Sequence, residues 1–236
     1  MSRTALRNYG GEVDLPAIAA LINRCAAADP FETGTCVEEL RSEYSDPLTD
    51  PGRDVMLAEQ GGDLIGVGEL WRPAAEDHVE AHLMMRVHPD VDAANIDPML
   101  LEWAGRRVRE LSRQRGLPGR LGTTTKERDA SRARLLESRG FAVERYFLRM
   151  RRDLTQPLDP PSLPPGFALR SIGGVEEAQL WVDLFNDSFV DHWNFHPSKV
   201  ERHEHFVRTD PNYQSDGDLV AIAPDGTPAA FCLALI

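Results

Sequence analysis

The sequence is poor in the features that mark membrane proteins, secreted proteins and small proteins stabilised by metals or disulfides. No run of about 18 apolar residues occurs in its 236 residues, so we expect no membrane-spanning helix and no membrane partner. The stretch Met1–Arg7 lacks the apolar core of a signal peptide, which favours a cytoplasmic protein. The three cysteines, Cys25, Cys36 and Cys232, are odd in number and lack Cys-x-x-Cys spacing, so we expect free, buried thiols.

Basic residues are also scarce relative to acidic ones. The chain has 26 basic and 38 acidic side chains and a net charge of −12. A protein that binds a nucleic-acid duplex concentrates positive charge on one surface, and this chain would have to do so against its own average field. We therefore expect no nucleic-acid partner. The content of 42% apolar and 27% charged residues is typical of a soluble globular protein.

What the sequence does contain is an internal repeat. The residues Ala-Leu-Arg-Asn-Tyr-Gly-Gly at 5–11 recur as Ala-Leu-Arg-Ser-Ile-Gly-Gly at 168–174. In each copy, apolar residues at three-to-four spacing follow directly, which predicts an amphipathic helix with one buried face. Two copies of one fold in tandem are the simplest explanation of such a match.

A second match lies downstream at nearly the same spacing. Residues 54–68 read as strand, tight turn, strand, with Gly61 and Gly62 at the turn, and residues 219–233 read the same way around Asp225 and Gly226. Two-residue turns of this kind favour positive φ at both central positions, which predicts a β-hairpin in each copy.

A proline-rich stretch separates the copies. Residues 155–166 contain five prolines in twelve positions, which is typical of a semi-rigid extended linker. We therefore predict a first domain at 1–154, a linker at 155–166 and a second domain at 167–236. A complete second copy would end near residue 318, on the repeat spacing of about 164.

The chain ends on the apolar strand 229–236, which would leave one strand edge open. Two explanations follow. Either the chain is a fragment of a longer protein, which we favour, or a neighbour covers the edge. That neighbour would be the first domain or a second chain, by self-association through the incomplete second domain.

The first copy continues with alternating strand and helix patterns. With the elements that precede them, these give the order β-α-α-β-β-β-α-β-α-β, a mixed α/β (α+β) sheet domain. Asp129 is placed to cap the last helix and Gly140 to end it. The expected segments are a strand at 78–87, a helix at 98–115, a short strand at 120–125, a helix after Asp129 and a last strand at 141–150.

Three local motifs in this order resemble the GNAT superfamily of acetyl-CoA-dependent N-acetyltransferases. Val87-His88-Pro89 resembles the family's Val-x-Pro at the end of the fourth strand. Residues 135–141, Leu-Leu-Glu-Ser-Arg-Gly-Phe, resemble its Leu-Tyr-x-x-x-Gly-Phe, and residues 149–154 resemble its C-terminal strand. Two copies in tandem resemble the mycothiol-synthase-like branch. The resemblance implies a GNAT-like domain followed by the front half of a second one.

The resemblance also implies where acetyl-CoA would bind as co-substrate. In the family, a Gln/Arg-x-x-Gly-x-Gly/Ala loop after the fourth strand wraps the pyrophosphate with backbone N–H groups at a helix start. Beyond Val87, the corresponding positions here are Asp92, Ala93, Ala94, Asn95, Ile96 and Asp97. The glycines are gone and two carboxylates are present, which opposes close approach of an anion. We therefore expect the first copy to bind acetyl-CoA poorly; Asp97 alternatively caps the next helix.

The first copy also lacks clear catalytic groups. The family's leaving-group tyrosine is replaced by Leu136. Glu80 lies on the fourth strand, where the resemblance implies a carboxylate that polarises a water, but a glutamate at the edge of the core is the alternative. The threonines at 123–125 offer hydroxyls and no evident base.

The second copy retains what the resemblance implies to be the acceptor side. The segment that joins its two helices, residues 186–197, is rich in aromatic and acidic side chains, which suit a cationic amine. Packing of these aromatics in the core or in a lid is the alternative. The candidate substrate-binding residues are Asp187, Asp191, His192 and Trp193. His203 and His205, like His192 and His196, are poorly spaced for a shared metal, so we expect none.

Two hypotheses for function follow. In the first, the protein is an enzyme that transfers acetyl from acetyl-CoA to an amine of a small molecule, with the chemistry in a full-length second domain and a degenerate first domain. In the second, degenerate acetyltransferase domains form a non-catalytic binding or scaffold protein. A pyrophosphate-loop motif within about 30 residues beyond Ile236 in the parent gene would favour the enzyme.

Overall fold

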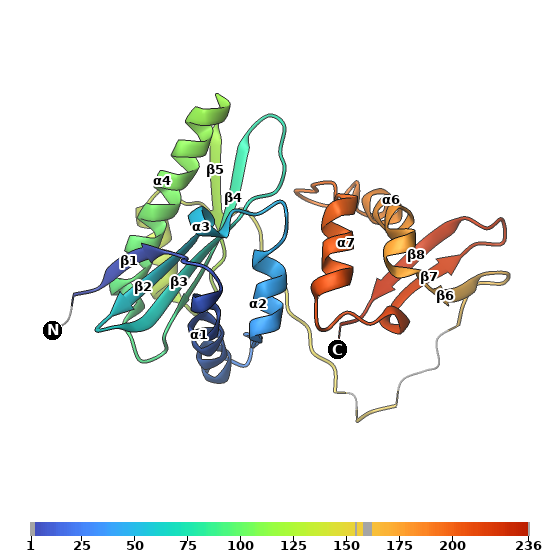
Figure 1. Cartoon of the computed structure of the whole chain (residues 1–236), viewed down its shortest axis with the longest axis horizontal. Coiled ribbons are helices and arrows are strands. Elements are labelled where there is room, and N and C mark those ends of the chain that lie inside the picture. Colours follow the sequence, from blue (N-terminus) through green and yellow to red (C-terminus); the bar gives the residue numbers. More distant parts are fainter. Residues whose placement is uncertain (1–2, 154, 158–161, 236) are drawn as a thin grey trace.

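The chain folds into two β-sheets that correspond to the two copies of the repeat (Figure 1). In the computed structural model, residues 3–153, 155–157 and 162–235 are described. The first sheet has five strands and the second has three. The mixed α/β class expected from the sequence is confirmed.

The first sheet has the order β1-β2-β3-β4-β5, antiparallel except for the parallel pair β4–β5. Helices cover both of its faces, with α1 and α2 on one side and α4 on the other (Figure 1). The strands are β1 (Ala5–Asn8), β2 (Val55–Gln60), β3 (Asp63–Trp71), β4 (Val79–Val87) and β5 (Gly119–Thr123). The helices are α1 (Leu15–Ala28), α2 (Val37–Tyr44), α3 (Pro51–Asp54), α4 (Asp97–Arg115) and α5 (Ala130–Ser138), with short 3-10 turns η1 (Glu12–Asp14) and η2 (Ala93–Asn95).

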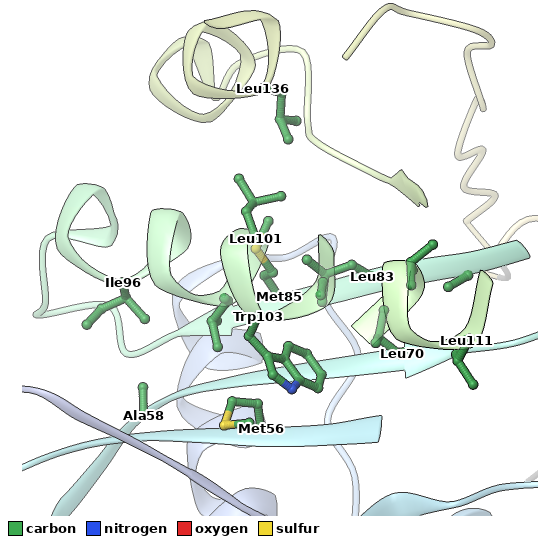
Figure 2. Packing of buried hydrophobic residues seen from close by; sticks show 14 of the residues in the cluster. Met56, Ala58, Leu70, Leu83, Met85, Ile96, Leu101, Trp103, Leu111 and Leu136 are labelled. Carbon is green, nitrogen blue, oxygen red and sulfur yellow. The ribbon is translucent and has the colours of Figure 1, made fainter. Parts of the chain in front are cut away.

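Alternation along the strands explains the two-sided core. On β4, the side chains of Leu83 and Met85 point toward α4 and pack with Trp103 and Leu101 (Figure 2). The intervening residues of β4 point to the α1–α2 face, as the two-residue period of a strand requires. That face therefore carries Glu80, His82, Met84 and Arg86, a row of three polar side chains and one methionine that borders the candidate site.

The second sheet has the order β6-β7-β8 and carries two helices. Its elements are β6 (Ala168–Ser171), η3 (Gly174–Glu177), α6 (Ala178–Phe189), α7 (Val200–Thr209), η4 (Ser215–Gly217), β7 (Asp218–Ile222) and β8 (Pro228–Leu233). β8 is an edge strand of this sheet. Association through that edge stays a prediction.

The internal repeat is reproduced in atomic detail. Arg7 forms a two-pronged ion pair with Asp14, at 2.7 and 2.8 Å, and Asp14 also accepts from the backbone N–H of Gly10. Arg170 forms the same pair with Glu177, at 2.7 and 2.8 Å, and Glu177 accepts from the N–H of Gly173. The same three positions of each copy thus tie the first strand to the start of the first helix.

The two hairpins close differently. Gly61 and Gly62 both have positive φ, 65° and 95°, as expected for a two-residue turn. In the second hairpin only Gly226 is left-handed, with φ 88°, so the expectation for Asp225 is wrong. Pro224 and Asp225 occupy the centre of a turn closed by the bond from Gly226 N to Ala223 O, and Pro224 suits its first central position because its ring fixes φ.

Three further expectations are wrong in whole or in part. Residues 141–150 form no strand; a strand needs a partner edge, and here Phe147 packs instead on Trp193 of the second copy, 6.0 Å between ring centroids. Phe141 packs against the core of the first sheet, whereas Val143, Tyr146, Leu148 and Met150 stay exposed, Leu148 by 87%. The short strand expected at 120–125 ends at Thr123. Of the cysteines, only Cys25 is buried, while Cys36 and Cys232 are exposed.

Some expectations fall outside the described residues. These are the domain boundary at residue 154, the centre of the linker at 158–161 and the chain end at Ile236. The domain bounds therefore stay a prediction. Among the described residues, no helix is long and apolar enough to cross a membrane.

Candidate active-site cavity and the seam between the copies

A cavity opens where β4 and β5 separate. The two strands pair from Val79–Gly119 to Leu83–Thr123, and β4 then continues to Val87 without its neighbour. The cavity beside this gap has a volume of about 570 Å³ and is lined by the far half of β4, the loop after β5 and the start of α5. The gap lies where the resemblance places the cofactor arm.

Polar groups converge on this cavity. The Nε2 atom of His82 lies 3.0 Å from the hydroxyl of Thr124, and burial lowers the pKa of His82. The hydroxyl of Thr125 is buried and has no hydrogen-bond partner among the described residues. A buried hydroxyl without a partner is costly, so this group is available to a polar ligand.

The cationic side chains of the cavity are already paired. Lys126 contacts both Asp29 and Glu32, and Arg128 also contacts Asp29. The hydrogen bonds from Arg128 and Lys126 hold the pKa of Asp29 well below its usual range. The segment after α1 is thereby fastened to the loop after β5, and these charges are neutralised within the protein.

The backbone N–H groups of the loop after β4 form hydrogen bonds within the loop itself. The carboxylate of Asp92 accepts from the N–H of Ala94 at 3.0 Å, and the N–H groups of Asn95 and Ile96 donate to carbonyls within the loop. Ile96 is fully buried in the core beneath α4. These amides are those that would have to face a pyrophosphate, which supports the expectation of weak cofactor binding by the first copy.

Asp97 has a different role from helix capping. It is the first residue of α4 rather than its cap and is 2% exposed. Its carboxylate accepts from Nε of Arg132 at 2.7 Å and from Nη2 at 3.0 Å. The alternative that Asp97 caps α4 is therefore wrong, because the carboxylate turns toward α5. The structure thus fixes a carboxylate at the start of α4, where the family binds an anion.

Leu136 also shows that the tyrosine position has become part of the core. It is 6% exposed and points toward Leu101 of α4 (Figure 2). A hydroxyl could not replace this methyl-rich side chain without meeting apolar neighbours. Asp129, in contrast, caps α5 as expected, accepting from the N–H of Arg132 at 3.0 Å.

Glu80 lies at the seam between the two copies. One oxygen of its carboxylate accepts from Nδ2 of Asn194 at 2.7 Å, and the other lies 3.2 Å from Nε2 of His78 and 3.1 Å from Nε2 of His196. Burial alone would raise the pKa of Glu80, but the hydrogen bonds from Asn194 and His78 bring the pKa below its usual value. With these partners Glu80 is held ionised; its catalytic assignment stays a prediction.

The segment that joins α6 and α7 reaches this carboxylate. Asn194 adopts a left-handed backbone with φ 53°, which asparagine tolerates better than most residues and which sends its side chain to Glu80. At the ends of the segment, Asn186 and Ser198 exchange two hydrogen bonds of 2.8 and 3.2 Å. The segment is therefore an ordered loop rather than a loose connection.

The candidate acceptor residues of this loop are open to solvent. Asp187, Asp191 and His192 are exposed, and neither aspartate forms an ion pair among the described residues. Trp193 is 39% exposed, with the guanidinium of Arg145 5.3 Å from its ring centre. The loop presents two free carboxylates and an aromatic face, an arrangement that suits a cationic amine.

Sequence reasoning did not bring these parts together. Glu80 and the 186–197 loop were separate candidates more than 100 positions apart, and nothing in the repeat indicated that they meet. It also missed the buried network in which Tyr44 donates to Glu69 at 2.6 Å and Arg86 donates to Glu69 at 2.7 Å. Polar residues alternating with apolar ones along β3 and β4 were the available signal.

The described residues contain no group of three or more His, Cys, Asp or Glu side chains arranged to hold a metal ion. His203 is buried against Trp181, with ring centroids 4.0 Å apart, whereas His205 contacts the carbonyl of Ser42 at 2.8 Å across the seam. Because a carbonyl oxygen only accepts, Nε2 of His205 is the donor. The two histidines thus serve different contacts.

Comparisons with known proteins agree with this fold. No protein-family model matches the chain. A mycothiol acetyltransferase from Salinispora arenicola is 27% identical over 227 residues, covering 91% of this chain and 66% of that relative. A second mycothiol acetyltransferase, from Salinispora tropica, is 25% identical over 98% of this chain and 69% of its own length. The chain therefore spans only about two thirds of the length of these relatives.

Solved structures match along the same extent. A GCN5-related N-acetyltransferase from Sphaerobacter thermophilus superposes with a TM-score of 0.68 at 21% identity, covering 99% of this chain and 72% of that one. A tandem GNAT protein from the clavulanic acid biosynthesis pathway superposes with a TM-score of 0.61 at 18% identity, covering 97% of this chain and 73% of that one. At these identities the likeness establishes the fold, and it extends through both sheets.

Proposed function

Because the chain is a tandem-domain GNAT protein related in sequence to mycothiol acetyltransferases, we propose that it forms part of an acetyltransferase. The enzyme moves an acetyl group from acetyl-CoA to an amine of a small molecule, in the cytoplasm. The chemistry belongs to the second domain, and the first domain positions the acceptor loop. The observation that carries the proposal is that the sequence similarity covers 91% of the chain and so runs through both copies.

The first copy supports this division of labour. A pyrophosphate cradle needs free amides at the start of a helix, and the amides of Ala94, Asn95 and Ile96 are used within the loop. The carboxylate of Asp97 is fixed at the same helix start. The first copy therefore does not supply the cofactor site of the proposed reaction.

The acceptor loop supports the choice of an amine. Asp187 and Asp191 carry exposed carboxylates without an ion pair among the described residues, so a cationic ammonium gains charge pairing from this loop. The ring of Trp193 in the same loop already attracts the cation of Arg145.

Contacts with the first copy hold this loop in place. Asn194 and His196 of the loop contact Glu80, and Arg145 of the first copy lies over the ring of Trp193. The loop is therefore positioned before the acceptor arrives, which reduces the entropic cost of binding.

Acetyl-CoA, when bound, supplies a thioester whose carbonyl carbon is attacked by the neutral amine, forming the C–N bond and releasing the thiol of CoA. The acceptor must therefore lose a proton before attack. The carboxylates of the loop bind the ammonium form and orient it. Glu80, held ionised by Asn194 and two imidazoles, fixes the loop, and its catalytic assignment stays a prediction.

The test is an acetyl-transfer assay on the protein encoded by the complete gene. Release of free CoA thiol from acetyl-CoA is followed against a panel of small amines, mycothiol-related amines among them. Amine-dependent release with acetylated product by mass spectrometry supports the proposal. Acetyl-CoA turnover that no amine stimulates, together with tight binding of an amine, would instead support the non-catalytic binding protein.

A further inference from the structure

Two histidines converge on one oxygen of Glu80. The Nε2 atoms of His78 and His196 lie 3.2 and 3.1 Å from the same carboxylate oxygen. The side chains of Glu80 and His196 are 13% and 14% exposed, so solvent screens this contact only weakly. The cluster sits on the α1–α2 face of β4, at the seam, and outside the cavity between β4 and β5.

The other nitrogen of each ring also faces an oxygen that can only accept. Nδ1 of His78 lies 2.6 Å from the carboxylate of Asp77, and Nδ1 of His196 lies 3.1 Å from the carbonyl oxygen of Ala74. A neutral imidazole carries one N–H and can satisfy one of its two acceptors. All four contacts form together only when both rings are doubly protonated imidazolium ions.

Only one of the two rings crosses the seam. His78, Glu80 and Ala74 belong to the first copy, whereas His196 comes from the loop between α6 and α7 of the second. Protonation of His196 therefore adds a bond and a positive charge between the copies. Protonation of His78 keeps Glu80 ionised and oriented toward His196.

We propose that His78, Glu80 and His196 form a proton-dependent clasp between the two copies, closed when both imidazoles are charged and loosened when they lose their protons. The acceptor loop is fastened to the first copy by this clasp, so its position follows pH. The clasp is a feature of the seam itself and does not depend on the proposed acetyl transfer.

The direction of the pH effect follows from the contacts. The hydrogen bond to Asp77, opposed by burial and aided by Glu80, raises the pKa of His78 above its usual value near 6.5. A raised pKa in the folded state means stabilisation that is present below the unfolded pKa and is lost as pH rises through the folded one. The contribution of His78 to the clasp is therefore present at mildly acidic pH and is lost above about pH 6.5.

The other charged side chains near the cluster do not take over the bridging contacts of the protonated imidazoles. Arg115 donates to the carbonyls of Ala75 and His78, and Arg120, opposite Glu80 on β5, pairs with Glu144. Arg145 lies over Trp193, and burial keeps His82 toward its neutral form by lowering its pKa. The charged or titratable groups around the clasp are thus Asp77, His82, Arg115, Arg120, Glu144 and Arg145, and none of their described contacts bridges Glu80 to the second copy.

A second contact across the seam provides a matched control. Arg202 of α7 donates to Asp46 of the first copy at 2.7 Å, and neither side chain is a histidine. We expect the strength of this pair to be the same at mildly acidic and mildly basic pH, because no imidazole takes part in it. A general effect of pH on the packing of the two copies would therefore also change the coupling in this control pair.

The test is a double-mutant cycle on the whole chain. Glu80→Gln and His196→Gln are made singly and together, and urea unfolding is measured at about pH 5.5 and about pH 8. We expect the coupling between the two sites to be at least about two-fold larger at the lower pH. The cycle of Asp46→Asn with Arg202→Gln should give the same coupling at both.

A coupling that is equal at both pH values, larger at the higher one or absent at both would overturn the clasp. If a variant fails to fold, nitrogen-15 NMR of the imidazole rings in the unaltered chain decides the matter. We expect His78 and His196 to show two protonated nitrogens at the lower pH. A ring of His196 that is neutral there would also rule the clasp out.

Discussion

The carboxylate of Asp97 and the guanidinium of Arg132 form a two-pronged ion pair that joins the start of α4 to α5, at 2.7 and 3.0 Å, with the side chain of Asp97 buried and that of Arg132 17% exposed. Burial opposes the charge of Arg132, but its pKa is raised because Asp97 stabilises that charge. Since a buried charge that loses its partner is not rehydrated, removing one member costs more than the pair contributes.

We expect Asp97→Asn to lower the free energy of unfolding by about 2 kcal/mol, because it removes the close charged partner of Arg132 and leaves only the 3.9 Å contact with Asp129. Replacing both residues by apolar ones, Asp97→Leu with Arg132→Met, should recover part of the loss. Urea unfolding measures both effects. Glu102→Gln, in the exposed pair Glu102–Arg106, is the control and should cost less than about 0.5 kcal/mol. An Asp97→Asn variant as stable as the parent would show that the pair is unimportant.

The first copy should bind acetyl-CoA weakly. Calorimetry on the chain should detect no low-micromolar binding, because the loop amides are occupied and Asp92 and Asp97 are negative. Combining Asp92→Arg with Asn95→Gly, while Asp97 stays to keep Arg132 paired, should improve binding. Asp90→Arg makes the same charge change just outside the loop and should not. Low-micromolar binding by the unaltered chain would contradict this prediction.

The acceptor loop should control affinity for the amine. In the complete protein, Asp191→Ala should raise the acceptor KM more than the acetyl-CoA KM, since the carboxylate is free to pair with an ammonium. Trp193→Ala should act in the same direction but also removes the contacts with Phe147 and Arg145. Asp183→Ala, at an exposed position of α6 before the loop, is the control. Acceptor kinetics that are unchanged in both variants would refute the assignment of this loop.

His203 should make the second copy sensitive to acid. Burial lowers the pKa of this ring to about 4, and its Nε2 has no partner among the described residues. Because the folded state binds the proton less readily than the unfolded one, stability is complete above about pH 6.5 and falls toward pH 4. Circular dichroism during acid titration should show this loss, and His203→Phe should reduce it. Acid sensitivity that is identical in His203→Phe would place the cause elsewhere.

The sequence predicted the scaffold because its signals are local and repeated. Leu100, Trp103 and Leu111 share one helix face, Gly61 and Gly62 permit only a tight turn, and the Arg7 and Arg170 segments match each other, so strands and helices could be placed without tertiary information. Residues 141–150 show where this fails. Their alternation predicts a strand, but pairing depends on a partner edge that lies far away in sequence.

The site was harder to predict than the scaffold. Glu80 and the loop at 186–197 were chosen separately on their chemistry, and their contact depends on how the two copies pack, which no periodicity encodes. Asp97 was interpreted through its neighbours in sequence, although its partner Arg132 lies 35 positions away. Charged pairs of this kind become visible only when the helices that carry them are placed in space.

The ion pairs Arg7–Asp14 and Arg170–Glu177 also bear on how independent the two copies are. Both copies have the same ion pair between strand and helix at corresponding positions, although the acid is aspartate in the first copy and glutamate, one methylene longer, in the second. Each copy thus carries its own tie between the first strand and the first helix, and neither copy depends on the other for this contact.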